Sequence, residues 1–286
     1  MIFILAFSLG CVNQKISSNN RVIVYASIPP QKEMIEAIGG EKVNVIILVS
    51  QGSDPHNAEL KPNQLIELSK ADVYFMIGSG IEFEIRYMDK IKDLNKKMLI
   101  VDSSKGIELI EVKSKKYSNE NEAEIKGEKD PHIWTSLKNG KTMIQNIYEG
   151  LVLVDPENKE YYLKNRDVYL NRLEETDNFI KGELRTLENR SFIIFHPSWG
   201  YFANDYNLTQ IAIEIEGKEP TLQSLVSIIE DAKRNDLKTI FISPGFSSKA
   251  AEIISKEIDG KIEVIDPLAE NYIENLKITA IKIKKK

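Results

Sequence analysis

The chain has 286 residues, of which 42% are hydrophobic and 28% are charged. This length suggests two ordinary domains, and the apolar fraction is sufficient to bury a core in each. The formal net charge of -5 argues against a nucleic acid or an anionic membrane bound through a basic field, so we predict no nucleic-acid partner. The single cysteine excludes a disulfide framework and cysteine-rich zinc modules. Any metal site in this chain must therefore use histidine and carboxylate ligands.

The N-terminus has the pattern of a lipoprotein signal. The first nine residues are apolar except for Ser8, and a Gly-Cys pair follows that ends at Cys11. The apolar stretch is far shorter than the roughly 18 to 20 residues of a spanning helix, but it has the size of a secretory signal core. We predict a signal peptide over residues 1–10, a lipid on the Cys11 sulfur and a lipid-anchored tether over residues 11–20. Ser8 stands where such signals usually have Leu, so a buried N-terminal strand with an incidental cysteine is the alternative.

Beyond residue 20, short β-branched runs alternate with helical patterns. The predicted strands are Val22–Tyr25, Val43–Val49, Val73–Ile77, Met98–Val101, Phe192–Phe195, Leu208–Ile213, Thr239–Ile242 and Ile262–Ile265. Helical stretches between them include Gln31–Ile38, Asn63–Ala71, Leu222–Lys233 and Ser248–Ile258. Near-continuous apolar strands separated by helices are typical of parallel sheets that are covered on both faces. Four strands, a gap and four more strands predict an α/β fold with two parallel-sheet lobes.

The gap between the two sets of strands contains a long helical pattern. Residues Lys113–Lys129 carry almost no large apolar side chains, which predicts a solvated surface loop, and a helix is expected over Ser136–Leu153. After the Asp155-Pro156 start signal, a helical pattern continues to about Leu187, which predicts a helix of roughly 30 residues and about 45 Å. Its apolar positions at helical spacing are Tyr161, Val168, Leu173, Phe179, Ile180, Leu184 and Leu187. We therefore expect an N-terminal α/β lobe over 21–155, a linking backbone helix over 156–187 and a C-terminal α/β lobe over 188–286.

The candidate ligands lie at the ends of predicted strands or in loops. In open α/β sheets, ligands bind beyond the carboxyl ends of the strands. His196 and Asp266 each directly follow a predicted strand, His56 lies in a loop past the second strand, and His132 precedes a helix start. None of the three histidines lies inside a helix or strand run. These positions are ones where a metal site could form between the lobes.

Each of the four candidate ligands is next to a proline. Asp-Pro-His occurs twice, ending at His56 and at His132, while His196 and Asp266 each precede a proline. Proline fixes its own backbone and restricts the residue before it, and preorganised ligands bind metal more tightly. The four residues are separated from one another by more than sixty positions, which excludes a local zinc finger or a helical His-Glu-x-x-His motif. The fold must therefore assemble the site, with two ligands from each lobe.

Ordinary structural roles are also open for these residues. A lone histidine is more often a hydrogen-bonded structural residue than a ligand, and an Asp-Pro pair is usually a turn. Asp266 before a proline is also an ordinary capping arrangement. Asp54 and Asp130 could accept hydrogen bonds from histidine N–H groups, although a turn is the more common role for both.

An ordered set of motifs resembles one known family. The motifs are Gly-Ser-Asp-Pro-His at 52–56, Gly-Ser-Gly-Ile-Glu at 78–82, Asp-Pro-His-Ile-Trp at 130–134 with Asn139, Phe-His-Pro-Ser-Trp-Gly-Tyr-Phe-Ala at 195–203, Glu-Pro-Thr at 219–221, Ile-Phe-Ile-Ser-Pro-Gly-Phe-Ser at 240–247 and Asp-Pro-Leu at 266–268. Over nearly the whole chain after the signal, this set resembles the cluster 9 solute-binding proteins, the metal-binding subunits of ABC importers for zinc, manganese and related ions. The resemblance implies His56, His132, His196 and Asp266 as the metal ligands. It also implies two α/β lobes bridged by one long backbone helix.

The ligand set favours zinc. Three imidazoles and one carboxylate suit a tetrahedral, borderline-soft ion, and the general affinity order also places Zn²⁺ above Mn²⁺ and Fe²⁺. Manganese-type members of the family usually have Glu where this chain has His196, although some members with three histidines also accept manganese. The chain departs from the family in three ways: residues 113–129 lack the histidines of the loop common in zinc-specific members, Ser243 stands where many members have Glu, and Leu137 replaces a frequent Pro. We predict Zn²⁺ as the transported ligand, with Mn²⁺ or Fe²⁺ as the alternatives.

The resemblance implies capture and delivery of a metal ion. We expect a monomer, not an enzyme, that the lipid on Cys11 anchors to the outer face of the cell membrane. It would bind the ion between its lobes and dock on a membrane permease whose ATPase drives uptake. Three histidines and a water on zinc are also a hydrolytic arrangement, so a zinc-dependent hydrolase is an alternative unless Asp266 closes the site. A surface adhesin is a third possibility, which needs only the anchor and an exposed face.

Overall fold

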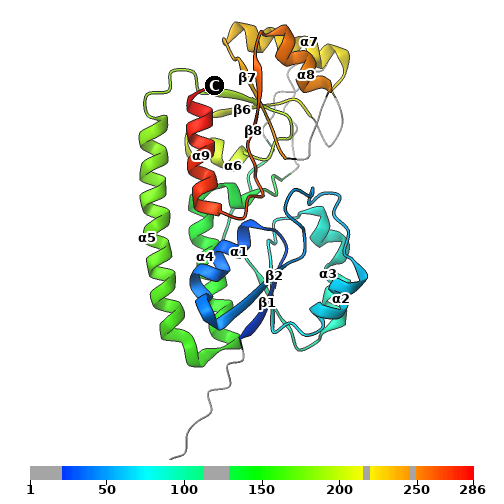
Figure 1. Cartoon of the computed structure of the whole chain (residues 1–286), viewed down its shortest axis with the longest axis vertical. Helices are drawn as coiled ribbons and strands as arrows, with labels where there is room; N and C mark the ends of the chain where they lie inside the picture. The colour runs from blue at the N-terminus through cyan, green and yellow to red at the C-terminus, as the bar shows by residue number, and fades with distance from the viewer. Residues whose placement is uncertain (1–20, 113–128, 215–219, 245–248) are drawn as a thin grey trace, which may run out of the picture.

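The computed structural model describes residues 21–112, 129–214, 220–244 and 249–286 (Figure 1). The predicted signal peptide, Cys11 and the tether lie outside the described residues, as do positions 113–128 of the predicted surface loop. Among the helices in the described ranges, none combines the length and apolar character needed to cross a membrane.

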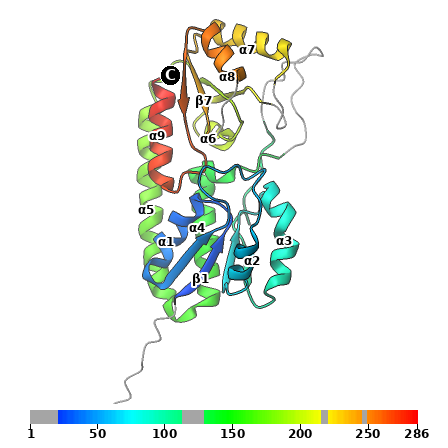
Figure 2. The ribbon, with the colours of Figure 1, turned by 45° about the vertical axis from the view of Figure 1, so that its right-hand side comes forward.

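The N-terminal lobe is built on a parallel four-stranded sheet with the order β2-β1-β3-β4. Its strands are β1 (Val22–Ala26), β2 (Val43–Ile47), β3 (Val73–Met76) and β4 (Leu99–Asp102). Its helices are α1 (Pro30–Gly39), α2 (Pro62–Leu68), α3 (Glu82–Leu94) and α4 (Leu137–Val154). Helices α1 and α4 lie on one face of the sheet, and α2 and α3 lie on the other (Figures 1 and 2). Both faces are therefore covered, which explains why the strands are apolar along most of their length.

The C-terminal lobe repeats this topology with the order β6-β5-β7-β8, again all parallel. Its strands are β5 (Ser191–Ile194), β6 (Thr209–Ala212), β7 (Thr239–Ile242) and β8 (Lys261–Val264). The helices that follow these strands are α6 (Gly200–Asp205), α7 (Leu222–Arg234), α8 (Lys249–Glu257) and α9 (Tyr272–Lys284). The predicted fold class, two parallel-sheet α/β lobes, is confirmed.

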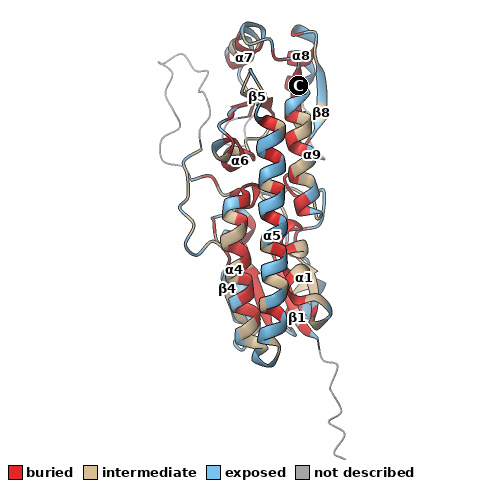
Figure 3. Cartoon of the chain, turned by 90° about the vertical axis from the view of Figure 1, so that its left-hand side faces the viewer, coloured by how far each residue is buried: buried red, intermediate tan, exposed pale blue. Residues whose placement is uncertain are grey.

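One long helix, α5 (Lys159–Leu184, 26 residues), runs beside both lobes and follows a short 3₁₀ turn at Pro156–Asn158 (Figure 3). The linking helix is therefore confirmed, with α-helical geometry that begins three residues after the predicted start. Of the apolar positions at helical spacing, Tyr161, Val168 and Phe179 are 36%, 54% and 39% exposed and lie outside the buried face. The residues that are buried on α5 are Tyr162, Tyr169, Leu173, Thr176, Ile180 and Leu184.

Two buried tyrosines of α5 form hydrogen bonds with acidic side chains outside the helix. The Tyr162 hydroxyl donates to Asp155 Oδ2 at 2.6 Å, and the Tyr169 hydroxyl donates to Glu33 Oε1 at 2.8 Å. A buried tyrosine needs such a partner for its polar end. Apolar spacing alone does not distinguish these tyrosines from their neighbours in sequence, because adjacent helical positions are only about 100° apart.

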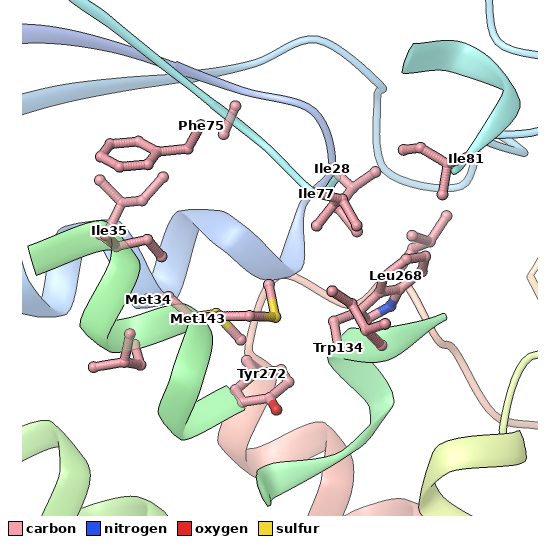
Figure 4. Close-up of a cluster of buried hydrophobic side chains, with 14 of the residues drawn as sticks. Ile28, Met34, Ile35, Phe75, Ile77, Ile81, Trp134, Met143, Leu268 and Tyr272 are labelled. Atoms are coloured by element: carbon pink, nitrogen blue, oxygen red, sulfur yellow. The ribbon is translucent and has the colours of Figure 1, made fainter. Parts of the chain in front are cut away.

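The two lobes share a continuous apolar core. The main cluster of buried side chains contains Phe75 and Trp134 from the N-terminal lobe together with Phe192 and Trp199 from the C-terminal lobe. Helix α9 follows the C-terminal sheet but packs against α5 and α1, and Figure 4 shows Tyr272 at its start among side chains of the N-terminal lobe. The segment between β8 and α9 therefore crosses back to the N-terminal lobe, which matters for Asp266.

Candidate metal centre

The imidazoles of the three histidines converge at one point. His56 Nε2 lies 3.2 Å from His196 Nε2, and His196 Nε2 lies 3.3 Å from His132 Nε2. Two nitrogens bound tetrahedrally to one Zn²⁺ at about 2.0–2.1 Å would be about 3.3–3.4 Å apart. In the described part of the chain, the three histidines form the group of potential ligands whose atoms all lie within 4.8 Å of one another. The spacing therefore fits a single tetrahedral ion.

Each histidine has a carboxylate at its other ring nitrogen. The pairs and their Nδ1-to-oxygen distances are His56 with Glu82 (2.5 Å), His132 with Asp130 (2.7 Å) and His196 with Glu214 (3.4 Å). An ionised carboxylate accepts only, so each Nδ1 carries the proton and each Nε2 presents a lone pair. Three lone pairs that face one another repel unless a cation lies between them. The carboxylates thus fix the tautomer that binds metal and orient the rings toward the common point.

His132 is the most buried of the three histidines. Its side chain is 6% exposed, compared with 20% for His56 and 15% for His196. Burial lowers the pKa of the His132 imidazole, and the neighbouring Asp130 carboxylate opposes this by favouring the charged form. The direction is downward, so the ring is neutral at pH 7, which is the form that a metal ion requires.

The two Asp-Pro-His motifs have related turns but different side-chain roles. Asp54 Oδ1 and Asp130 Oδ1 each accept the backbone N–H of the histidine two residues later, both at 2.9 Å. Asp130 Oδ1 also accepts from the His132 ring, whereas Asp54 Oδ2 accepts from the Asn57 amide at 2.6 Å. Of the two suggested acceptors for histidine rings, the structure therefore supports Asp130, and Asp54 is a turn residue.

The loop before α3 holds both histidines of the N-terminal lobe. Glu82, at the start of α3, contacts the His56 ring, and the Ser79 hydroxyl donates to the carbonyl oxygen of Pro131, next to His132. Gly78 and Gly80 have φ angles of 81° and 98°, a conformation that side chains other than glycine rarely adopt. Glu84 accepts the backbone N–H groups of Ile77 (2.5 Å) and Gly78 (2.9 Å), and burial raises its pKa. Hydrogen bonds therefore fix this loop, and the loop in turn contacts the His56 ring and the residue before His132.

Asp266 lies at the wall of the same site. Its Oδ1 accepts the backbone N–H of Leu268 at 2.8 Å, and burial raises the pKa of its carboxyl group. The carboxylate lines the cavity beside the three histidines, but it is not a member of the group within 4.8 Å. The structure therefore brings three predicted ligands together and places the fourth at the rim of their cavity.

The cavity at the histidines is small. Its volume is about 30 Å³, and it is lined by residues 52–56, His132, Trp134, His196, Ser243, Pro244 and residues 266–268. That volume is close to the space of one water molecule, whereas clefts for drug-sized ligands are about 300–1,000 Å³. Ser243 contributes a buried hydroxyl that has no hydrogen-bond partner within the described ranges. The cavity has the size for one ion.

Sequence reasoning from position did not find the partners Glu82 and Glu214. Glu82 ends the Gly-Ser-Gly-Ile-Glu motif at 78–82, but neither its motif nor the position of Glu214 connects them to the histidines. Glu214 lies two residues after the end of β6, beyond the carboxyl end of a strand, so the rule that found His196 and Asp266 could have found it. Glu82 is 26 positions from His56 and begins a helix, and no sequence signal connects the two.

These features define a class of protein. Two α/β lobes of the same topology, a long helix that runs beside both and a three-imidazole site for one ion are the features of a two-lobed metal-binding receptor.

Comparison with known proteins identifies the family. A family model described as ZnuA, zinc-uptake complex component A, periplasmic, matches residues 24–286. The high-affinity zinc uptake system protein ZnuA of Bacillus subtilis is 29% identical over 256 residues, which cover 88% of this chain and 80% of that protein. A crystal structure of ZnuA superposes with a TM-score of 0.85 at 40% identity, covering 93% of this chain and 99% of the other. A ZnuA deletion mutant with zinc bound gives a TM-score of 0.83 at 40% identity, covering 93% and 97% of the two chains. The chain belongs to the ZnuA family of extracytoplasmic zinc-uptake components, as the motif resemblance implied.

Proposed function

We propose that this chain is the metal-binding subunit of an ABC importer, which captures Zn²⁺ between its lobes and delivers it to a membrane permease driven by an ATPase. The observation that carries the proposal is the convergence of three imidazoles with Nε2 separations of 3.2 and 3.3 Å. Membership of a zinc-uptake family and the size of the cavity support the same cargo.

The ligands in this proposal are His56, His132, His196 and Asp266. Three nitrogens and one oxygen suit Zn²⁺, and a carboxylate at the fourth position would close the coordination sphere. Asp266 lines the same cavity as the histidines, which supports its place as the fourth ligand. Mn²⁺ and Fe²⁺ are the alternative cargoes, and they bind imidazole sites more weakly than Zn²⁺ does.

The small cavity supports ion capture over hydrolysis. A zinc hydrolase needs room for an organic substrate beside a metal-bound water. A cavity of about 30 Å³ is close to the space of one water molecule and matches a single ion. The position of Asp266 at the cavity wall, where it can occupy the fourth site, favours a closed binding site.

The cellular context of the proposal comes from the N-terminal sequence. A lipid on Cys11 would anchor a monomer to the outer face of the cell membrane, and the polar tether would let it reach the permease. Radiolabelled palmitate should be incorporated into the wild type, and a Cys11→Ser change should abolish this incorporation if the anchor exists.

The central test is metal retention by the purified chain. Competition with a chromophoric chelator should give a much higher affinity for Zn²⁺ than for Mn²⁺ or Fe²⁺, and His196→Ala should lose most of that affinity. The exposed Glu230 on α7 provides a control as Glu230→Gln, which should bind like the wild type. Equal zinc retention by wild type and His196→Ala would refute the assignment of the site.

A further inference from the structure

We propose that Trp134 is a positioning residue, which holds the Asp266 turn against the metal centre through its indole N–H. This inference rests on the proposed function, because it concerns how the fourth ligand is held. Trp134 reaches Asp266 through the backbone of the next residue and makes no bond to the ion itself.

The contact joins two segments that are far apart in sequence. Trp134 Nε1 donates to the carbonyl oxygen of Pro267 at 2.7 Å, and the indole is 1% exposed. The Trp134 ring lies edge-on to the His132 ring, with 5.3 Å between their centroids. Figure 4 shows Leu268 next to Trp134, so the turn after Asp266 packs against the indole as well as bonding to it.

The turn that carries Asp266 is fixed by its two backbone carbonyls. The carbonyl oxygen of Asp266 accepts from Asn275 Nδ2 on α9 at 2.6 Å, and that of Pro267 accepts from Trp134. The Asp266 side chain accepts a hydrogen bond from the N–H of Leu268. Between them, the ring of Pro267 fixes its own φ angle. The direction of the carboxylate therefore depends on where the Pro267 carbonyl is held.

Trp134 also connects this turn to a second ligand. It lies in the 3₁₀ turn Ile133–Thr135, directly after His132, and the whole turn is buried. One short rigid segment thus carries the His132 imidazole at one end and the donor to the Asp266 turn in its middle. Because metal ligands must be held to within about 0.5 Å, such a shared support fixes the distance between the two ligands.

The only other tryptophan in the sequence, Trp199, provides a matched control. It is fully buried, and its Nε1 has no hydrogen-bond partner among the residues that the structure describes. Replacing each tryptophan by phenylalanine removes similar volume and one N–H group. Trp134→Phe breaks a bond to the Asp266 turn, whereas Trp199→Phe breaks none.

The experiment is a double-mutant cycle on zinc affinity, measured by chelator competition on the full chain. We expect Trp134→Phe to weaken zinc binding about tenfold, the lower end of the loss typical for groups that orient metal ligands. Trp199→Phe should remain within about twofold of the wild type. Added to Asp266→Ala, Trp134→Phe should cause no further loss, because its effect passes through Asp266.

The visible absorption of bound Co²⁺ reports the coordination of the ion, which would not change if Trp134 only stabilised the fold. Co²⁺ in a site with three histidines and Asp266 should show the strong visible absorption of four-coordinate cobalt. Trp134→Phe should reduce this absorption toward that of Asp266→Ala, while Trp199→Phe should leave it unchanged. If Trp134→Phe lowered affinity equally with and without Asp266, the indole would act by packing alone and the inference would be wrong.

A second measurement leaves Trp134 in place in case its substitution prevents folding. In Trp199→Phe the single indole N–H resonance belongs to Trp134, and zinc should slow its exchange with solvent. Zinc should not slow it in Trp199→Phe combined with Asp266→Ala; equal slowing in both variants would overturn the inference. A wild-type chain that bound no zinc would instead refute the proposed function, so the two failures are distinguishable.

Discussion

The two lobes are built on sheets of the same strand order, but they present their proposed metal ligands in different ways. In the C-terminal lobe, His196 and Asp266 each lie two residues after the last residue of a strand, β5 and β8 respectively. In the N-terminal lobe, His56 and His132 lie on loops well beyond β2 and β4. The same topology thus supports ligands both at strand ends and on loops.

The difference shows what a loop needs in order to hold a ligand as firmly as a strand end does. His132 and its backbone N–H both bond to Asp130, and the Ser79 hydroxyl bonds to the adjacent Pro131. His196 lies two residues after the end of β5. Its Nδ1 is 3.4 Å from Glu214, whereas the Nδ1 of His132 is 2.7 Å from Asp130. Side-chain hydrogen bonds in the N-terminal lobe replace the positioning that the sheet itself supplies in the C-terminal lobe.

The largest effect should follow from removing a histidine of either lobe. At a zinc concentration 100 times its Kd, the wild type should gain about 2.7 kcal/mol of stability toward unfolding. His132→Ala and His196→Ala should gain almost none at the same concentration, because each leaves only two imidazoles. Denaturant unfolding with and without zinc provides the measurement. A variant of one lobe that kept the full gain would show that the site does not need both lobes.

The next largest effect should distinguish a histidine held by side-chain hydrogen bonds, His132, from one positioned by a strand end, His196. Asp130→Asn should weaken zinc binding about 10- to 100-fold, the range typical for loss of a carboxylate that orients a metal-bound histidine. Glu214→Gln should cost less than about tenfold, because its contact to His196 is long and the strand still positions the ring. Chelator competition measures both, with the exposed Glu230→Gln as control. If Glu214→Gln were the more damaging variant, the proposed contrast between loop and strand would be wrong.

The sequence was sufficient for the fold because its signals are local. The eight strands lie at nearly their predicted positions, because short runs rich in β-branched residues, such as Val43–Val49, favour strands. The start of the long helix was set by Asp155-Pro156. Helical spacing alone did not identify its buried residues, because the burial of Tyr162 instead of Tyr161 depends on a hydrogen bond to Asp155, outside the helix, and on tertiary packing.

Strand-end or loop position and family resemblance predict the candidate ligands of the site but not their hydrogen-bond partners. The three histidines were singled out because they lie outside regular structure, and the fold brings them together. Their pairing with Glu82 and Glu214 depends on three-dimensional approach and was not predicted. The expectation of two ligands from each lobe stays a prediction; Asp266 follows β8 of the C-terminal lobe, and the turn after it bonds to Trp134 of the N-terminal lobe.

A smaller effect should appear in the pH dependence of the metal-free protein. Burial lowers the pKa of His132 in the folded state below its value of about 6.5 in the unfolded chain. Protonation therefore favours unfolding, and the stability from His132 is present above pH 6.5 and is lost as pH falls toward the folded pKa. The wild type should lose up to about 1.4 kcal/mol per pH unit there relative to His132→Gln. Urea unfolding in chelator at pH 7.5, 6.5 and 5.5 tests this, and parallel curves for the two proteins would contradict it.

The smallest effect should come from the ion pair between Lys32 on α1 and Glu270, which also joins the segment after Asp266 to the N-terminal lobe. The two side chains are 31% and 42% exposed, and exposed pairs contribute about 0–1 kcal/mol. Lys32→Met should therefore weaken zinc binding less than about fivefold. In 1 M salt, where the Debye length is only about 3 Å, the variant and the wild type should bind zinc equally well. Lys70→Met, which breaks the exposed pair with Glu67 on α2, controls for a general loss of charge. If Lys32→Met were as damaging as Trp134→Phe, the ion pair rather than the buried indole would hold the Asp266 turn.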